Sequence, residues 1–191
     1  MPNRNQNRRR LQKPKDIFLI AEQFLAVARL PIRLQNVDHS ILSPYTSYEV
    51  KALIQSPEIA YMACAAFALE LYFKCLIRYG RKSFDGLHDL SKLFNLIGKH
   101  HRVKIKKCWD AHSQQVKGDL CQRYIQGGRT VPHIDFDFVL SLSRDAFVTM
   151  RYAYEGIPPN AGWAGDAIID CTRQRILELH PEWEARSARL D

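Results

Sequence analysis

The sequence predicts an all-α fold, and three observations carry that prediction. Apolar residues recur at intervals of three and four in several segments, which places them on one face of a helix. Serine, aspartate or proline precedes these segments and glycine or proline follows them, as expected at helix ends. The sequence has no alternating apolar and polar pattern of useful length, so we expect no strand. The most consistent architecture is a four-helix-type bundle with additional N- and C-terminal helices.

The length and composition indicate one domain with a basic tail. The chain has 191 residues, of which 46% are hydrophobic, enough to build a single core. We expect a disordered basic tail over residues 1–13, one helical domain over 14–181 and a C-terminal tail over 182–191. The net charge is +8, and six positive charges lie in residues 1–15, which contain no acid and leave +2 for the rest. Such an arm suits a polyanion such as nucleic acid, or it solubilises a disordered end.

Cysteine usage and hydropathy indicate a cytoplasmic protein without membrane spans. No apolar run reaches the length that crosses a bilayer, and the polar N-terminus is not a secretory signal. The five cysteines are odd in number and lack a closely spaced pair, so we expect reduced thiols. Cys108 and His112 lie one helical turn apart and Cys121 follows, which could begin a zinc site. A fourth ligand is not evident, and we expect neither a metal nor another cofactor.

The first helix is predicted over residues 16–30, and Pro31 is expected to end it. The apolar residues that share one of its faces are Ile17, Ile20, Phe24 and Val27. After a connector, Ser43 and Pro44 open a second, shorter helical stretch that ends at Ser56.

A long buried helix is predicted over residues 59–80, with Ser56 and Pro57 before it and Gly80 at its end. Glu70 lies within its apolar stripe, and Lys74 follows one turn later in the order that favours an ion pair. A carboxylate in such a place must find partners or become neutral, so both residues are candidates for a binding site. An ion pair that fixes the helix register explains the same two residues without any chemistry.

A short helix is predicted from His88 to Gly98, and a longer one over about 103–125. His88 is either an acid or base in a cleft or a hydrogen-bonded structural histidine, and Asp89 is either a helix cap or a binding residue. The basic run between the two helices either contacts phosphates or forms a solvated helix start. Its lysines that we take as binding candidates are Lys104, Lys106 and Lys107.

The last two helices are predicted over residues 135–155 and 165–180. Arg151 and Tyr154 flank the apolar stripe of the first of them. We expect Arg151 to form a buried, charge-assisted pair with Glu70, or to clamp a phosphate.

Three pieces of the sequence, in this order, resemble the HEPN superfamily, the small helical bundles of bacterial toxin–antitoxin and phage-defence proteins. These pieces are AFALELYFKCLI at 66–77, HDLSKLF at 88–94 and RYAYE at 151–155. The resemblance implies a helical bundle that dimerises and places a cleft at the subunit interface. It also implies a link to ribonuclease activity, because many members are metal-independent endoribonucleases.

The sequence departs from the ribonuclease members at their Arg and His motif. Those members resemble one another in an Arg followed by His after four to six residues, whereas no His follows Arg151 at that spacing. The spacing does occur from Arg81 to His88, and from Arg173 or Arg175 to His180. In such enzymes a His moves protons while an Arg stabilises the charge that develops on phosphate. The catalytic candidates are His88, Arg151 and Arg81.

Together these expectations describe a nucleic-acid- or nucleotide-binding component of a bacterial stress or defence system. We expect a homodimer that binds RNA or a nucleotide, with a possible partner protein encoded nearby. One alternative is a metal-independent endoribonuclease that uses His88 with Arg151 or Arg81. A second alternative is a non-catalytic scaffold that binds another protein.

Overall fold

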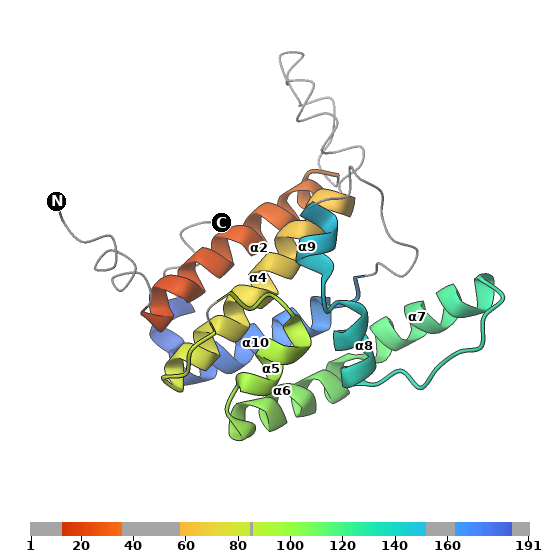
Figure 1. Ribbon diagram of the computed structural model, residues 1–191. Helices are drawn as coiled ribbons and strands as arrows, with labels where there is room; N and C mark the ends of the chain where they lie inside the picture. The colour runs from red at the N-terminus through yellow and green to blue at the C-terminus, as the bar shows by residue number, and fades with distance from the viewer. Residues whose placement is uncertain (1–12, 36–57, 85, 152–162, 185–191) are drawn as a thin grey trace, which may run out of the picture.

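The computed structural model of the chain describes residues 13–35, 58–84, 86–151 and 163–184 (Figure 1). These residues form helices and no strand, which confirms the predicted all-α class. The elements are α2 (Pro14–Gln35), α4 (Glu58–Tyr79), α5 (Leu90–Leu96), α6 (Lys99–His112), α7 (Gln114–Gln126), α8 (Phe136–Leu142), α9 (Ala146–Arg151), α10 (Asp166–Leu179) and the short 3₁₀ helix η3 (Pro181–Trp183).

Several predictions fall outside the described residues. They concern the basic tail, the short helical stretch after Ser43, Tyr154 and the end of the C-terminal tail. The side chain of Arg151 also lies outside the description, although the backbone of that residue belongs to α9. The predicted division into residues 1–13, 14–181 and 182–191 stays a prediction.

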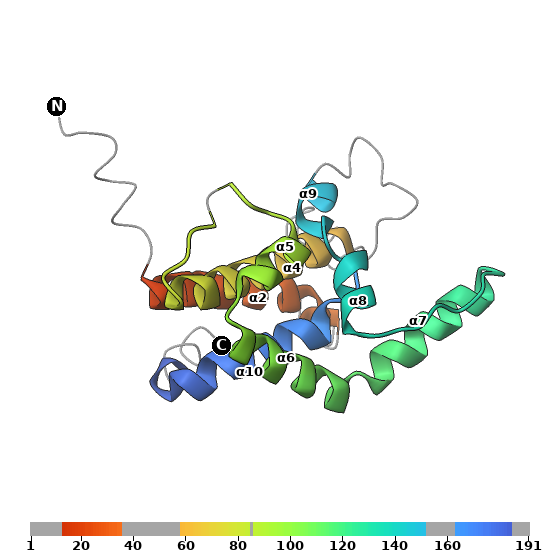
Figure 2. The same ribbon diagram turned by 60° about the horizontal axis from the view of Figure 1, so that its bottom comes forward.

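The helices are arranged around α4, which packs against α2, α5, α9 and α10. Helices α2 and α4 run antiparallel side by side in both views, and α10 and α6 form a second layer across them (Figure 2). Helix α7 projects away from the rest of the described chain (Figure 1). This arrangement agrees with a helical bundle, and the specific HEPN-like topology stays a prediction.

Helix α4 matches the long buried helix predicted over 59–80. Ten of its residues are buried, which follows from its apolar composition on all sides. Its length and composition would also allow it to cross a membrane. The prediction that no apolar run reaches that length is therefore wrong. In the structure 56% of its most apolar 18-residue segment is buried inside the protein. The buried core helix of a soluble protein can have the same length and composition.

The C-terminal end of α4 is a left-handed turn at Arg81. The Arg81 N–H donates to the Arg78 carbonyl at 2.9 Å, and the Lys82 N–H donates to the Ile77 carbonyl at 3.2 Å. This pair of bonds is the Schellman pattern, in which the left-handed position follows the last helical residues. That position is held by Arg81, with φ of 59°, and not by the neighbouring Gly80. A side chain with a Cβ is disfavoured there.

The first helix is longer than predicted. It begins at Pro14, where the missing N–H of proline costs nothing, and continues through Pro31 to Gln35. The prediction that Pro31 ends the helix is therefore wrong. Proline in a helix interior removes one hydrogen bond and disturbs the preceding turn, but the rest of the helix can continue past it.

The helix predicted over 103–125 is two helices that meet at Ser113. This residue ends α6 and precedes α7, and it is fully buried. The Ser113 hydroxyl makes no cap hydrogen bond and has no hydrogen-bond partner among the described residues, so side-chain capping does not explain this break. Helix α6 begins at Lys99, so the basic run is part of this helix and does not lead into it.

The helix predicted over 135–155 is likewise divided, into α8 and α9. The break begins at Ser143, whose hydroxyl accepts a bond from the Ala164 N–H at 3.3 Å. It also turns the Arg144 carbonyl outward to accept the Leu90 N–H at 3.0 Å. The break thus provides hydrogen-bond acceptors for the backbone N–H groups of Ala164 and Leu90. An unbroken helix would not present these acceptors.

Aspartate caps fix the start of two other helices. Asp89 accepts the Lys92 N–H at 2.8 Å at the start of α5, and Asp135 accepts the Phe138 N–H at 2.8 Å at the start of α8. Asp89 therefore has the structural role that was one of its two predicted roles.

A buried polar network that the sequence analysis missed joins α2, α4 and α10. Glu22 is 8% exposed and accepts bonds of 2.9 to 3.1 Å from the Arg173 guanidinium, and the Tyr72 hydroxyl also donates to it. Burial and the adjacent Glu22 raise the pKa of Tyr72. Burial acts to lower the pKa of Arg173. The hydrogen bonds and charge of Glu22 outweigh burial, so the pKa of Arg173 is raised. The network therefore holds a paired carboxylate and guanidinium in the core.

Candidate functional site

A pocket of about 380 Å³ lies between α2, α4 and the segment that connects α4 to α5. It is lined by Asp16, Ile17, Ile20, Phe67, Glu70, Leu71, Lys74, Phe84 and His88. Its walls are aliphatic and aromatic, and its polar groups come mainly from one face of α4 and from the connecting segment. Pockets with apolar walls and a few convergent polar groups are the usual form of small-ligand sites.

Glu70 is the buried polar centre of this pocket, with none of its side chain exposed. Its Oε1 accepts a hydrogen bond from Lys74 Nζ at 2.6 Å. Both of its oxygens also lie within bonding distance of His88 Nδ1, at 3.0 and 3.2 Å. The prediction that Glu70 must have charged or polar partners, with Lys74 among them, is confirmed. The second partner described is His88, and the predicted pair with Arg151 stays a prediction.

The hydrogen bond to Glu70 determines which ring nitrogen of His88 is available to a ligand. A carboxylate has only acceptor atoms, so Nδ1 must carry the proton that joins the two groups. In the neutral ring Nε2 then has the lone pair and can accept a proton. The His88 side chain is 48% exposed, so a ligand in the pocket can reach it. The arrangement is an oriented histidine backed by a buried carboxylate, which suits acid–base chemistry.

Aromatic rings complete the surroundings of these polar groups. Phe67 of α4 stacks on Phe147 of α9, with ring centroids 4.5 Å apart, and the His88 ring lies 6.4 Å from Phe147. Lys74 Nζ lies 5.4 Å from the centre of the Phe84 ring, within range of a cation–π contact. Because α9 contacts the site through Phe147, Arg151 is placed one helical turn beyond that contact.

The other predicted binding residues lie elsewhere. Arg81 is exposed in the left-handed turn after α4 and does not line the pocket. Lys104 and Lys107 are exposed on α6, which lies in the second layer (Figure 2). Lys106 binds Asp137 at 2.6 Å. The basic run and the Glu70 pocket therefore do not form one site.

The Arg and His spacing near the C-terminal end of α10 produces a structural cluster. Arg175 is buried, donates to His101 Nδ1 at 3.1 Å and pairs with Glu178 at 2.7 Å. The His180 ring stacks on Trp183 with a centroid distance of 4.0 Å. These side chains already make hydrogen bonds, an ion pair and a ring stack within the cluster. They therefore do not form a typical phosphate-binding site.

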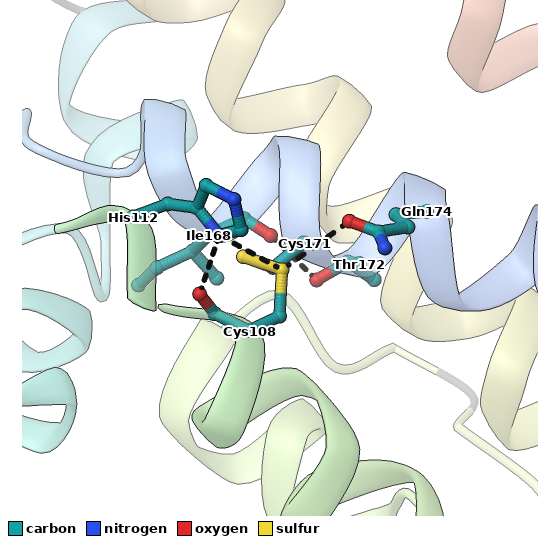
Figure 3. Close-up of a disulfide and its surroundings, with 6 residues drawn as sticks. All are labelled: Cys108, His112, Ile168, Cys171, Thr172 and Gln174. Carbon is teal, nitrogen blue, oxygen red and sulfur yellow. Dashed lines mark hydrogen bonds between the residues drawn. A yellow bond between two sulfur atoms is a disulfide. The ribbon is translucent and has the colours of Figure 1, made fainter. Parts of the chain in front are cut away.

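Three side chains elsewhere could hold a metal ion. Cys108, His112 and Cys171 have their ligand atoms within 4.8 Å of one another. Cys108 and Cys171 form a disulfide, so the expectation that every cysteine is a reduced thiol is wrong (Figure 3). Cys64, Cys75 and Cys121 are free, and burial raises the pKa of Cys75 to about 12. The possible zinc site therefore uses Cys171 in place of Cys121.

No family model, curated protein or solved structure matches this chain in three separate comparisons. The resemblance to the HEPN superfamily therefore stays a prediction based on the three sequence pieces. The function must be argued from the geometry of the pocket.

Proposed function

We propose that the chain is a HEPN-like helical protein whose pocket binds the base of a nucleotide or of unpaired RNA. In this proposal it serves as a nucleic-acid- or nucleotide-binding component of a bacterial stress or defence system. The observation that carries the proposal is the fully buried Glu70 at the polar end of an apolar pocket, bonded to Lys74 and to the half-exposed His88.

The walls and the polar end of the pocket fit different parts of a nucleobase. Phe67 and Phe84 present aromatic surface, and stacking of a base on such a ring contributes about 1–3 kcal/mol. Glu70 and the unprotonated Nε2 of His88 accept hydrogen bonds from ring or exocyclic N–H groups, and Lys74 donates to carbonyl oxygens. Residues 1–15 carry six of the eight net positive charges, and this basic segment attracts the phosphates that a nucleotide or RNA brings with its base.

Titration with nucleoside monophosphates and with short single-stranded RNA tests this proposal. Isothermal calorimetry on the wild type is compared with Phe84→Ala and Lys74→Met, which change the wall and the polar end. The control is Phe138→Ala, a partly buried ring of α8 that does not line the pocket. We expect Phe84→Ala to weaken binding about 5- to 100-fold, the equivalent of one stacking contact. Equal affinity in Phe84→Ala and the control, or no binding of any nucleotide, would refute the proposal.

A second candidate function is metal-independent RNA cleavage, favoured by the bond between His88 and Glu70. His88 Nε2 would take the proton of a 2′-hydroxyl, whose oxygen attacks the adjacent phosphate. The products are a 2′,3′-cyclic phosphate and a 5′-hydroxyl, which receives a proton. Glu70 would hold the histidine in the required tautomer, and Arg151 would stabilise the charge on the phosphate.

The enzymatic candidate is tested by incubation of mixed-sequence single-stranded RNA with the protein in EDTA. We expect cleavage by the wild type, loss of about two or more orders of magnitude in His88→Ala, and no cleavage of the matching DNA. RNA retention without cleavage would leave the binding function alone. If the protein neither binds nor cleaves RNA, the remaining alternative is the non-catalytic scaffold that binds another protein.

The predicted homodimer is part of the same proposal. Three apolar side chains on one face of α2 are exposed, by 40% to 57%: Ile20, Val27 and Leu30. An exposed apolar stripe of this kind suits burial against a second copy. Light scattering of the wild type and Val27→Lys tests this contact, because a monomeric wild type would exclude it.

A further inference from the structure

The disulfide between Cys108 and Cys171 has a histidine beside it. Cys108 lies on α6 and Cys171 on α10, with their Cα atoms 5.6 Å apart (Figure 3). His112 follows Cys108 by one helical turn, and its Nδ1 lies 3.8 Å from the Cys108 sulfur. The three ligand atoms are within 4.8 Å of one another. Two sulfurs and one imidazole nitrogen are the donor types that Zn²⁺ prefers.

The packing of the two helices holds these side chains together independently of the disulfide. Trp109 follows Cys108 and is fully buried, and Ile168 and Thr172 are fully buried on either side of Cys171. The Thr172 hydroxyl donates to the Ile168 carbonyl at 2.7 Å, which secures the turn of α10 that carries Cys171. Reduction of the disulfide therefore leaves the two thiols facing each other across a packed interface.

The separations fit a tetrahedral zinc site after small side-chain movements. A Zn–S length of about 2.3 Å places two ligating sulfurs roughly 3.8 Å apart in tetrahedral geometry, so both cysteine side chains must rotate to move the sulfurs apart from their bonded positions. His112 is exposed, so its ring can exchange the bond that Nδ1 makes to the Cys108 carbonyl at 2.8 Å for a bond to metal. The Gln174 amide, 3.4 Å from the Cys108 sulfur, or a water molecule can supply the fourth ligand.

We propose that the reduced protein binds one Zn²⁺ ion through Cys108, His112 and Cys171, and that the disulfide is the oxidised, metal-free form of the same site. On binding, the two thiols release two protons to solvent as two Zn–S bonds form. Hydrogen peroxide converts the zinc form back to the disulfide. The two thiolates give two electrons to the peroxide, a sulfur–sulfur bond replaces the two Zn–S bonds, and Zn²⁺ leaves. The peroxide takes up two protons and becomes two water molecules.

Cobalt substitution tests the ligand set directly. The protein is reduced with a phosphine in EDTA, exchanged into metal-free buffer and titrated with Co²⁺, whose thiolate charge-transfer and visible bands report sulfur ligands and four-coordination. We expect one Co²⁺ per chain, displaced by Zn²⁺. Cys171→Ser should abolish the charge-transfer signal, and His112→Ala should weaken affinity at least about tenfold.

Two controls keep the result decisive. Cys121→Ser removes a free cysteine of α7 and should bind cobalt as the wild type does. His112→Ala alters an exposed residue, so its folding is not at risk. One equivalent of peroxide added to the zinc form should release one Zn²⁺ and consume two thiols per chain, measured with a chromogenic chelator and by mass spectrometry. The proposal is wrong if no thiolate band forms, if Cys171→Ser retains it, if Cys121→Ser loses it, or if oxidation leaves the metal bound.

Discussion

Replacement of Glu70 by leucine removes the carboxylate that Lys74 and His88 share. Lys74 is 12% exposed and would keep a positive charge in an apolar pocket without its ion-pair partner at 2.6 Å. Removal of one member of a buried pair costs about 3–5 kcal/mol, because the other charge stays desolvated. We take the lower value, about 3 kcal/mol, since part of Lys74 reaches solvent. For a chain of this size that corresponds to a fall in Tm of roughly 6–12 °C.

The double variant Glu70→Leu with Lys74→Met separates an ion pair from a simple packing effect. Removal of both charges leaves no unpaired group, so the double variant should return to within about 1 kcal/mol of the wild type. The coupling free energy between the two positions is then at least about 2 kcal/mol. His88→Ala serves as the exposed control and should cost less than about 1 kcal/mol, because the histidine is half exposed.

Urea unfolding, followed by far-ultraviolet circular dichroism, measures the free energies of unfolding of the wild type and of each variant under one condition. Additive effects of Glu70→Leu and Lys74→Met would mean that the carboxylate and the ammonium do not interact in the folded protein. That result would remove the physical basis of the pocket, since the polar end is defined by this pair and His88.

Three further predictions concern other parts of the chain. Arg81→Gly should raise the free energy of unfolding by about 1 kcal/mol, because glycine adopts the positive φ of 59° without a Cβ, and an unchanged urea midpoint would count against the strained turn. Reduction of the bond between Cys108 and Cys171 in EDTA should cost about 4 kcal/mol, from the loop-closure entropy of a separation of 63 residues, and calorimetry with and without reductant checks it. Burial and the adjacent Arg175 lower the pKa of His101 from 6.5, so the unfolded state binds more protons in acid. Stability is therefore full above about pH 6.5 and declines as the pH falls below it, and His101→Gln should flatten that profile.

Local patterns in the sequence were sufficient to locate the candidate site. Glu70 was identifiable because a carboxylate interrupts an apolar stripe, and Lys74 followed from the four-residue spacing on a helix. His88 was predicted as a candidate acid or base in a cleft, and the structure places its Nδ1 at 3.0 Å from Glu70. Arg81 was selected by spacing alone, which does not describe where a turn directs a side chain, and the structure places it outside the pocket.

Contacts between distant segments explain most of what the sequence did not reveal. The apolar periodicity continues across Ser113 and Ser143, and the break at Ser143 depends on the Ala164 N–H, which is 21 residues away from it. The pairing of Cys108 with Cys171 requires α6 to pack on α10, and no local pattern encodes that packing.

A comparison of the two buried glutamates shows why one belongs to a candidate site and the other does not. Glu22 interrupts the apolar face of α2 as Glu70 interrupts that of α4, so the sequence pattern alone treats them alike. In the structure Arg173 binds both oxygens of Glu22, and the Tyr72 hydroxyl binds one of them, within the core. The acceptors of Glu22 are thus used by Tyr72, which is fully buried, and by Arg173, whose side chain is 27% exposed. Glu70 has a half-exposed histidine as a partner and lines a pocket of about 380 Å³, so a ligand can compete for or extend its hydrogen bonds. The pocket beside Glu70, and not burial of the carboxylate itself, is therefore what marks Glu70 as the candidate functional group.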